Sequence, residues 1–186
     1  MLQHLRLVAL IVLAFAAGSA SADDFNRGRN PAPPKVILDT DFNTITRNAI
    51  YGNTGLGIDL DSIGAPNPND PGDADSGANQ QLNAPVIGSA TQQLVSGTAC
   101  VTCTVEVFRA AGEAGAYGQG QTFVGSALVG ADGAFSASVS GIAAGDYVTA
   151  TATDALGNTS EFALNLRAVA SAAPPPQGVY LALVRR

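Results

Sequence analysis

Apolar and polar residues alternate along the stretch 147–153, with valine and alanine at the even positions and threonine at the last three odd ones. A period of two built from small and β-branched residues predicts a half-buried β-strand. Residues 154–158 (Asp-Ala-Leu-Gly-Asn) then supply the chemistry of a turn. We therefore predict a β-hairpin whose second strand again has its large apolar residues on one face: Phe162, Leu164 and Leu166.

Short apolar runs bounded by turn residues recur throughout 82–168. The dipeptide Asp132-Gly133 is a hairpin signal, and residues 134–139 form the predicted returning strand. This spacing of about seven strands predicts an all-β protein, with an immunoglobulin-like β-sandwich over 82–168. The other predicted strands lie at 85–87, 94–95, 97–108 and 121–129.

The first part of the chain, residues 1–22, has the pattern of a secretory signal peptide. An uninterrupted apolar run at 7–17 follows Arg6, and Ala20-Ser21-Ala22 offers a small-residue cleavage site. A membrane anchor is the alternative, but the run has only about half of the roughly 20 apolar residues that a spanning helix needs. We therefore expect an exported bacterial protein, secreted or held at the cell surface, with no membrane span after cleavage.

Composition argues against several classes of function. Only 13% of the 186 residues are charged and the net charge is −6, whereas phosphate binding needs clustered cations, so we expect no nucleic-acid partner. The single histidine, His4, lies in the expected signal peptide, so the mature chain would lack a Ser–His–Asp or Cys–His pair. No pair of carboxylates has a pattern typical of glycoside hydrolysis. The sequence therefore predicts a protein that is not an enzyme.

Isoleucine, asparagine and glycine recur at short intervals from Asn43 to Leu60, in the order N-x-I-x-x-N-x-I-Y-G-N-x-G-x-G-I-D-L. With this motif, residues 39–60 resemble the final coil of secreted bacterial right-handed β-helix proteins. A solenoid coil cannot bury its own face, and about three repeats are needed for stability. This single coil is therefore expected either to belong to a truncated relative, which we favour, or to dock on the sandwich. Residues 23–38 are interpreted as a linker.

The later segments 102–108, 120–125, 144–154 and 157–162 resemble bacterial Ig-like repeats, which are common in exported surface proteins and often follow β-helices. This resemblance implies a non-catalytic module that acts as a spacer or adhesion domain. The alternative is a glycan-binding accessory domain left from a β-helix polysaccharide-active enzyme. The expected partner is in either case an unknown protein or glycan at the cell surface.

Two aromatic residues form the candidate binding surface. Tyr117 lies in the glycine-rich loop 109–120, and Phe123 lies on the strand predicted to follow it. Exposure of both rings on one patch would favour glycan binding, whereas burial of Phe123 would favour the spacer.

The segment 61–81 is acidic and rich in turn residues. Its run Asp73-Ala-Asp75-Ser-Gly77 places two carboxylates before a glycine turn, and calcium takes about six to eight hard oxygen ligands. One interpretation is therefore a calcium site at Asp73 and Asp75. The alternative is a solvated linker whose aspartates stabilise turns. We expect no other cofactor.

Cys100 and Cys103 form a C-x-x-C motif at the start of a predicted strand. Two cysteines in an exported protein usually pair, so we predict a disulfide. Free thiols and a redox pair are the alternatives, and a redox pair would need a helix N-terminus to lower the thiol pKa. The closed loop is very short, so its entropic stabilisation should be small.

Residues 169–186 combine an alanine- and proline-rich stretch with a short apolar segment and two arginines. The first part has the composition of a flexible tether. The second part resembles short apolar-basic tails of exported bacterial proteins, which implies a sorting signal. An extra edge strand or a frayed end is the alternative.

Overall fold

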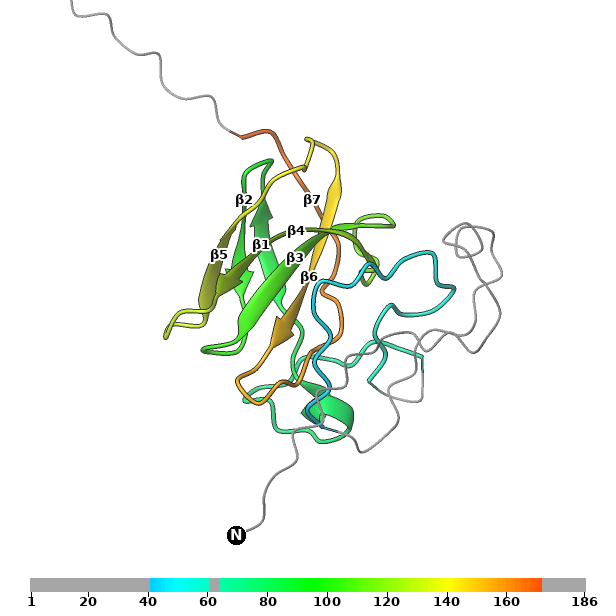
Figure 1. Ribbon diagram of the computed structural model, residues 1–186, viewed down its shortest axis with the longest axis vertical. Coiled ribbons are helices and arrows are strands. Elements are labelled where there is room, and N and C mark those ends of the chain that lie inside the picture. The colour runs from blue at the N-terminus through cyan, green and yellow to red at the C-terminus, as the bar shows by residue number, and fades with distance from the viewer. Residues whose placement is uncertain (1–40, 61–63, 172–186) are drawn as a thin grey trace, which may run out of the picture.

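Two antiparallel β-sheets packed face to face form the body of the computed structural model, which describes residues 41–60 and 64–171 (Figure 1). One sheet has the strand order β1-β2-β5, and the other has the order β4-β3-β6-β7. The predicted all-β sandwich is therefore confirmed. The strands are β1 (Val86–Ala90), β2 (Leu94–Thr98), β3 (Thr104–Ala110), β4 (Gly120–Leu128), β5 (Ala134–Ser138), β6 (Tyr147–Thr153) and β7 (Leu166–Arg167).

Three predicted segments lie wholly or mostly outside the described residues. These are the signal peptide 1–22, the linker 23–38 and the tail 169–186, of which only 169–171 are described. Their assignments stay predictions.

β3 and β6 lie side by side in the larger sheet and supply much of the core between the sheets. Val105 pairs with Ala152 and Val107 with Ala150, and all four side chains are fully buried. Their small size lets the two sheets approach closely. The facing sheet completes this core with four buried residues: Ala90, Val95, Phe135 and Ala137.

The outer face of β6 is buried as well, which the alternation alone does not predict. Thr149 and Thr151 are 0% and 2% exposed, so the prediction of a half-buried strand is wrong. The reason is that two segments cover this face: residues 41–60, here called the cap, lie over the outer face of the larger sheet (Figure 1), and the chain at Gly118 and Ala163 lies against Thr149. A short 3₁₀ turn, η1 (Ala78–Gln81), packs beside the cap.

A second apolar cluster lies between the cap and this sheet. Phe108 packs edge to face against Phe162 and Phe123, with ring centroids 5.6 Å and 5.8 Å apart. The cap contributes Ile58 and Leu60, which are 2% and 0% exposed. Edge-to-face aromatic pairs add about 0.5–1.5 kcal/mol beyond the burial of their area. The cap is thus a third layer with its own core.

Side-chain oxygens of β3 and of the chain between β6 and β7 satisfy the backbone of the cap. The N–H groups of Arg47 and Leu60 donate to the carboxylates of Glu106 (2.7 Å) and Glu161 (3.0 Å). An unsatisfied buried N–H costs about 1–3 kcal/mol, so these acceptors fix the path of the cap. Within residues 41–60 the backbone forms no strand and has one bridge residue, Asp59. The resemblance to a β-helix coil therefore stays a prediction.

The turn at Asp132-Gly133 joins the two sheets and does not form a hairpin. β4 pairs with β3, whereas β5 pairs with β2 in the other sheet. The hairpin prediction is wrong because the chain crosses the core at this turn. Val129 and Phe135, which flank the turn, are both buried, at 2% and 3% exposure.

The alternation predicted for the last strand is also wrong. Phe162 enters the cluster under the cap and Ala163 enters the core between the sheets, while Leu164 is 47% exposed. Here the chain is held between β6 and residues 115–118, because the backbone of Ala163 forms one backbone hydrogen bond with each of them. Regular pairing with β6 is limited to the two residues of β7.

Candidate functional site

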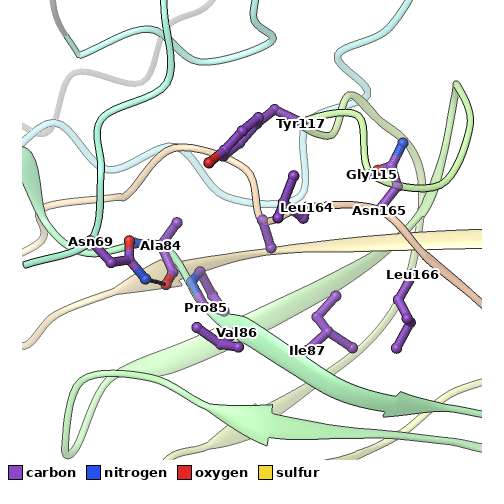
Figure 2. A pocket seen from close by; sticks show the side chains of 11 residues that line it. Asn69, Ala84, Pro85, Val86, Ile87, Gly115, Tyr117, Leu164, Asn165 and Leu166 are labelled. Atoms are coloured by element: carbon purple, nitrogen blue, oxygen red, sulfur yellow. Dashed lines mark hydrogen bonds between the residues drawn. The ribbon is translucent and has the colours of Figure 1, made fainter.

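A groove opens along the edge of the sandwich where β1 faces β7 and the residues that precede it. At one end of this seam, the Val169 N–H donates a 3.0 Å hydrogen bond to the Ala90 carbonyl and joins the sheets. Toward Val86 the seam widens into a groove with a volume of about 390 Å³ (Figure 2). Ligand pockets commonly have volumes of about 300–1,000 Å³. The groove is therefore large enough to hold side chains of a partner.

The walls of this groove are mainly apolar. Residues 84–87 form one wall, and residues 163–166 with Tyr117 form the other (Figure 2). Val86, Leu164 and Tyr117 are 56%, 47% and 39% exposed, so three large apolar side chains lie at its mouth. Clustered exposed apolar side chains of this kind mark interaction sites.

Two asparagines hold the polypeptide around the groove. The Asn69 amide exchanges two hydrogen bonds with the Ala84 backbone, of 2.8 and 2.9 Å. Asn165, which is 4% exposed, donates its backbone N–H to the Ala116 carbonyl (2.8 Å) and its Nδ2 to the Glu113 carbonyl (3.0 Å). These bonds fix the loop that carries Tyr117.

Phe123, the other predicted binding residue, does not line the groove. Its ring packs against Phe108, and the guanidinium of Arg47 lies over it, 4.9 Å from its centroid. Phe123 is therefore partly buried under the cap. The structure does not bring it together with Tyr117 in one aromatic patch.

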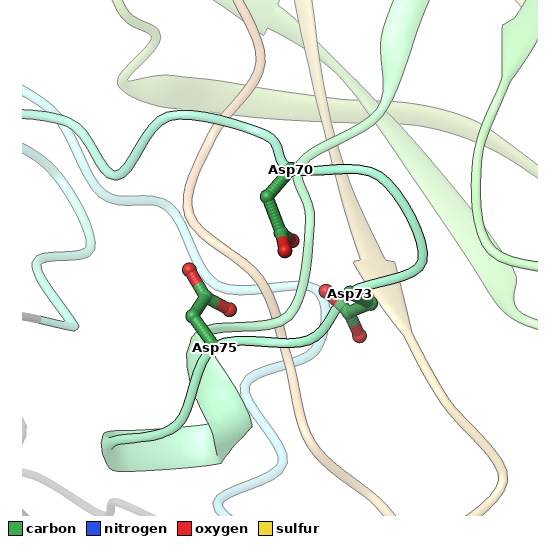
Figure 3. Close-up of side chains that lie close together, drawn as sticks. All are labelled: Asp70, Asp73 and Asp75. Atoms are coloured by element: carbon green, nitrogen blue, oxygen red, sulfur yellow. The ribbon is translucent and has the colours of Figure 1, made fainter.

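Three aspartates gather next to the Asn69 end of the groove (Figure 3). Carboxylate oxygens of Asp70, Asp73 and Asp75 all lie within 4.8 Å of one another. The sequence pattern indicated Asp73 and Asp75 but not Asp70. The available signal was the turn Pro71-Gly72, which folds the chain back so that Asp70 faces the other two.

Hydrogen bonds to Asn83 hold this loop in place. Asn83 Oδ1 accepts from the Asp70 N–H (2.9 Å), and Asn83 N–H donates to Asp73 Oδ1 (2.8 Å). Loss of hydration, followed by the negative charges of Asp70 and Asp73, raises the pKa of Asp75. Clustered carboxylates favour a nearby cation, and calcium prefers such oxygen ligands. Calcium at Asp73 and Asp75 stays a prediction, with Asp70 as an additional donor.

Cys100 and Cys103 are joined by a disulfide in the turn between β2 and β3. Cys103 is 1% exposed and belongs to the core between the sheets. The cross-link therefore lies where the chain passes from one sheet to the other. No helix begins at these residues.

Comparisons with known proteins add no relative. No protein-family model matches the chain, and a search of curated proteins finds no match. In the part of the chain that the structure describes, no helix has the length and apolar character to cross a membrane.

Proposed function

We propose that the chain is a non-catalytic Ig-like module of an exported bacterial protein, acting as a spacer or adhesion domain at the cell surface. The observation that carries the spacer role is the position of the ends of the described chain. Asp41 accepts a 3.1 Å hydrogen bond from the Gln80 N–H of η1, and the Ser171 N–H bonds to Gln92 beside the β1–β2 turn. These sites lie at opposite ends of the long axis (Figure 1). The folded body thus holds these two points of the chain apart.

The strand pairing supports the Ig-like assignment. In an Ig fold with strands lettered A to G, B and E pair in one sheet, and C, F and G share the other. Here β2 pairs with β5, and β3, β6 and β7 are neighbours in the second sheet. β4 adjoins β3, where Ig domains of the variable type add a strand next to C.

Two features support an exported location. The pattern of residues 1–22 is that of a signal peptide, and the disulfide between Cys100 and Cys103 is of the kind that persists in oxidising compartments. A rigid exported module also needs a well-packed body. The third layer formed by the cap supplies this by covering the outer face of β3 and β6.

Glycan binding is the second candidate function. Tyr117, 39% exposed at the mouth of the groove, favours it because it offers a ring to a sugar. Phe123 favours the spacer, because Phe108 and Arg47 cover its ring.

Spin labels at both ends of the body test the spacer role. Gln80→Cys and Ala170→Cys place them at exposed positions beside the two ends without removing the Asp41 side chain, while the native cysteines stay paired. Pulsed dipolar spectroscopy should give one narrow distance distribution if the body is rigid. A broad distribution would contradict the spacer.

Affinity electrophoresis in gels that contain bacterial or plant polysaccharides tests the alternative. If the native chain is retarded and Tyr117→Ala is not, the protein binds glycan and the spacer proposal is wrong. Tyr51→Ala is the matched control, because Tyr51 is 40% exposed but lies on the cap, away from the groove. If the protein is only a spacer, the native chain should migrate equally in gels with and without polysaccharide.

A further inference from the structure

We propose that the groove between β1 and β7 binds the chain's own segment 179–186, Val-Tyr-Leu-Ala-Leu-Val-Arg-Arg, with its arginines directed toward Asp70, Asp73 and Asp75. This inference goes beyond the spacer role and does not depend on it. Three observations carry it: the apolar character of both partners, the direction of the chain at Ser171, and the position of the carboxylates.

The apolar match concerns both faces of the segment. Residues 179–184 are apolar at odd and even positions alike. A strand that is covered on both faces has such a continuous apolar run, whereas a strand on a solvated edge alternates. The groove offers apolar walls on two sides, with Val86 and Leu164 exposed at its mouth. One row of side chains would enter the groove and the other would cover this mouth.

The direction of the chain brings the segment to the groove. Thr91 and Val169 form a parallel bridge, so β1 and the chain after β7 run the same way toward the closed end of the seam. A chain that reverses after Ser171 would return along the groove antiparallel to both. The intervening residues 172–178 span up to about 23 Å when extended. From Ala90 back to Val86 is only about 13 Å along a strand.

The carboxylates lie where the arginines would arrive. A segment antiparallel to β1 points its C-terminal end toward the Asn69 end of the groove, and Asp70 follows Asn69 directly. Among the described residues, no lysine or arginine forms an ion pair with the three aspartates. Arg185 and Arg186 would therefore supply the opposite charge that this cluster favours.

A fluorescent peptide with the sequence of residues 178–186 tests the proposal. The receptor is the full chain with Leu181→Asp and Leu183→Asp, which leaves the groove without its own apolar segment. We expect the peptide to bind this variant and to bind the unsubstituted chain at least 10-fold more weakly, because the native segment competes. Equal binding to both chains, or no binding to the variant, would overturn the proposal.

Additional substitutions in the receptor locate the binding site. Val86→Asp should weaken peptide binding at least 10-fold, whereas Leu128→Asp should not change it. Leu128 is the matched control because it is 70% exposed and lies on β4, at the opposite edge of the sheet from β7. Leu164→Asp replaces Val86→Asp if circular dichroism shows that the latter is unfolded. Equal affinity in the groove variant and the control would exclude the groove.

Charge and oligomeric state complete the test. Asp70→Asn, Asp73→Asn and Asp75→Asn together should lower the affinity about 5-fold at low salt and remove most of its salt dependence. Affinity that is unchanged in this triple variant would overturn the role of the arginines. Light scattering should show a monomer. A dimer that Leu181→Asp and Leu183→Asp dissociate would overturn the intramolecular form and assign the groove to the segment of a second copy.

Discussion

The carboxylate of Glu106 on β3 accepts a 2.7 Å hydrogen bond from the backbone N–H of Arg47, whose guanidinium nitrogen Nε lies 3.8 Å from the same group. This contact joins the cap to a central strand of the larger sheet. Glu106 is 6% exposed, and loss of hydration raises its pKa, while the hydrogen bond and positive charge of Arg47 act in the opposite direction. The attachment of the cap is therefore sensitive to pH.

The substitution Glu106→Gln is expected to reduce the pH dependence of stability. Because the pKa of Glu106 is raised above 4.5 in the folded protein, its contribution is complete below that pH and declines as the pH rises through the raised pKa. Glutamine keeps an acceptor oxygen for Arg47 but does not titrate.

Urea unfolding between about pH 4 and 7 measures this effect. The variant should lose less free energy of unfolding than the native chain as the pH rises. Glu113→Gln is the control, since Glu113 is exposed in a loop. Parallel pH profiles for Glu106→Gln and the native chain would contradict the assignment.

Asn79→Ala is expected to lower the free energy of unfolding by about 2–4 kcal/mol. Asn79 is fully buried, its Oδ1 accepts from the Asn43 N–H (2.8 Å), and its Nδ2 donates to the carbonyls of Asn43 (2.8 Å) and Thr159 (2.9 Å). Alanine would leave these groups without partners. Asn79→Asp places a carboxylate oxygen against the same two carbonyls in a fully buried site, so at neutral pH it should destabilise the protein in urea at least as much as alanine does. A nearly neutral Asn79→Ala would show that the cap is not held through this amide.

Asp75→Asn is expected to stabilise the metal-free protein at neutral pH. The pKa of Asp75 is raised above 3.8, so its contribution to stability declines as the pH rises through that pKa, and asparagine removes the decline. Thermal unfolding without metal, in the Leu181→Asp and Leu183→Asp background that keeps the C-terminal arginines away from the cluster, should show a higher melting temperature for Asp75→Asn than for the control Asp132→Asn, whose side chain is exposed in a turn. Equal melting temperatures would contradict this result.

A calcium ion bound at the aspartate cluster would have the opposite effect, because it would stabilise the native chain more than Asp75→Asn. A ligand that binds only the folded state raises the melting temperature with its concentration. Millimolar calcium should therefore stabilise the native chain and have less effect on Asp75→Asn or Asp73→Asn. A native melting temperature that calcium leaves unchanged would remove the calcium site.

Loss of the disulfide should have a modest effect. Cys100 and Cys103 are three positions apart, and closing so short a loop is worth about 2 kcal/mol in chain entropy. Cys100→Ala removes the cross-link and leaves Cys103 in the core, so it isolates this contribution. Urea unfolding of this variant should agree with that of the native chain under reducing conditions. A loss above about 4 kcal/mol would mean that the turn does more than close a loop.

Local pattern is enough to predict much of this protein. The alternation around Val105 and Val107, and that of β6, predicts strands because a period of two depends only on neighbouring residues. The spacing of Cys100 and Cys103 likewise permits their disulfide within one turn. The all-β sandwich follows from these short-range signals.

Only the tertiary structure decided which surfaces are buried and which stay open. Thr149 and Thr151 have the pattern of solvent-facing residues, yet both are buried by other segments. The hydrogen bond between Ile45 of the cap and Thr159 joins residues 114 positions apart. The groove and the arrival of Asp70 beside Asp73 also depend on where separate segments meet. Contacts between distant segments leave no periodic signal in the sequence, because periodicity records only the direction of a side chain and not what it meets.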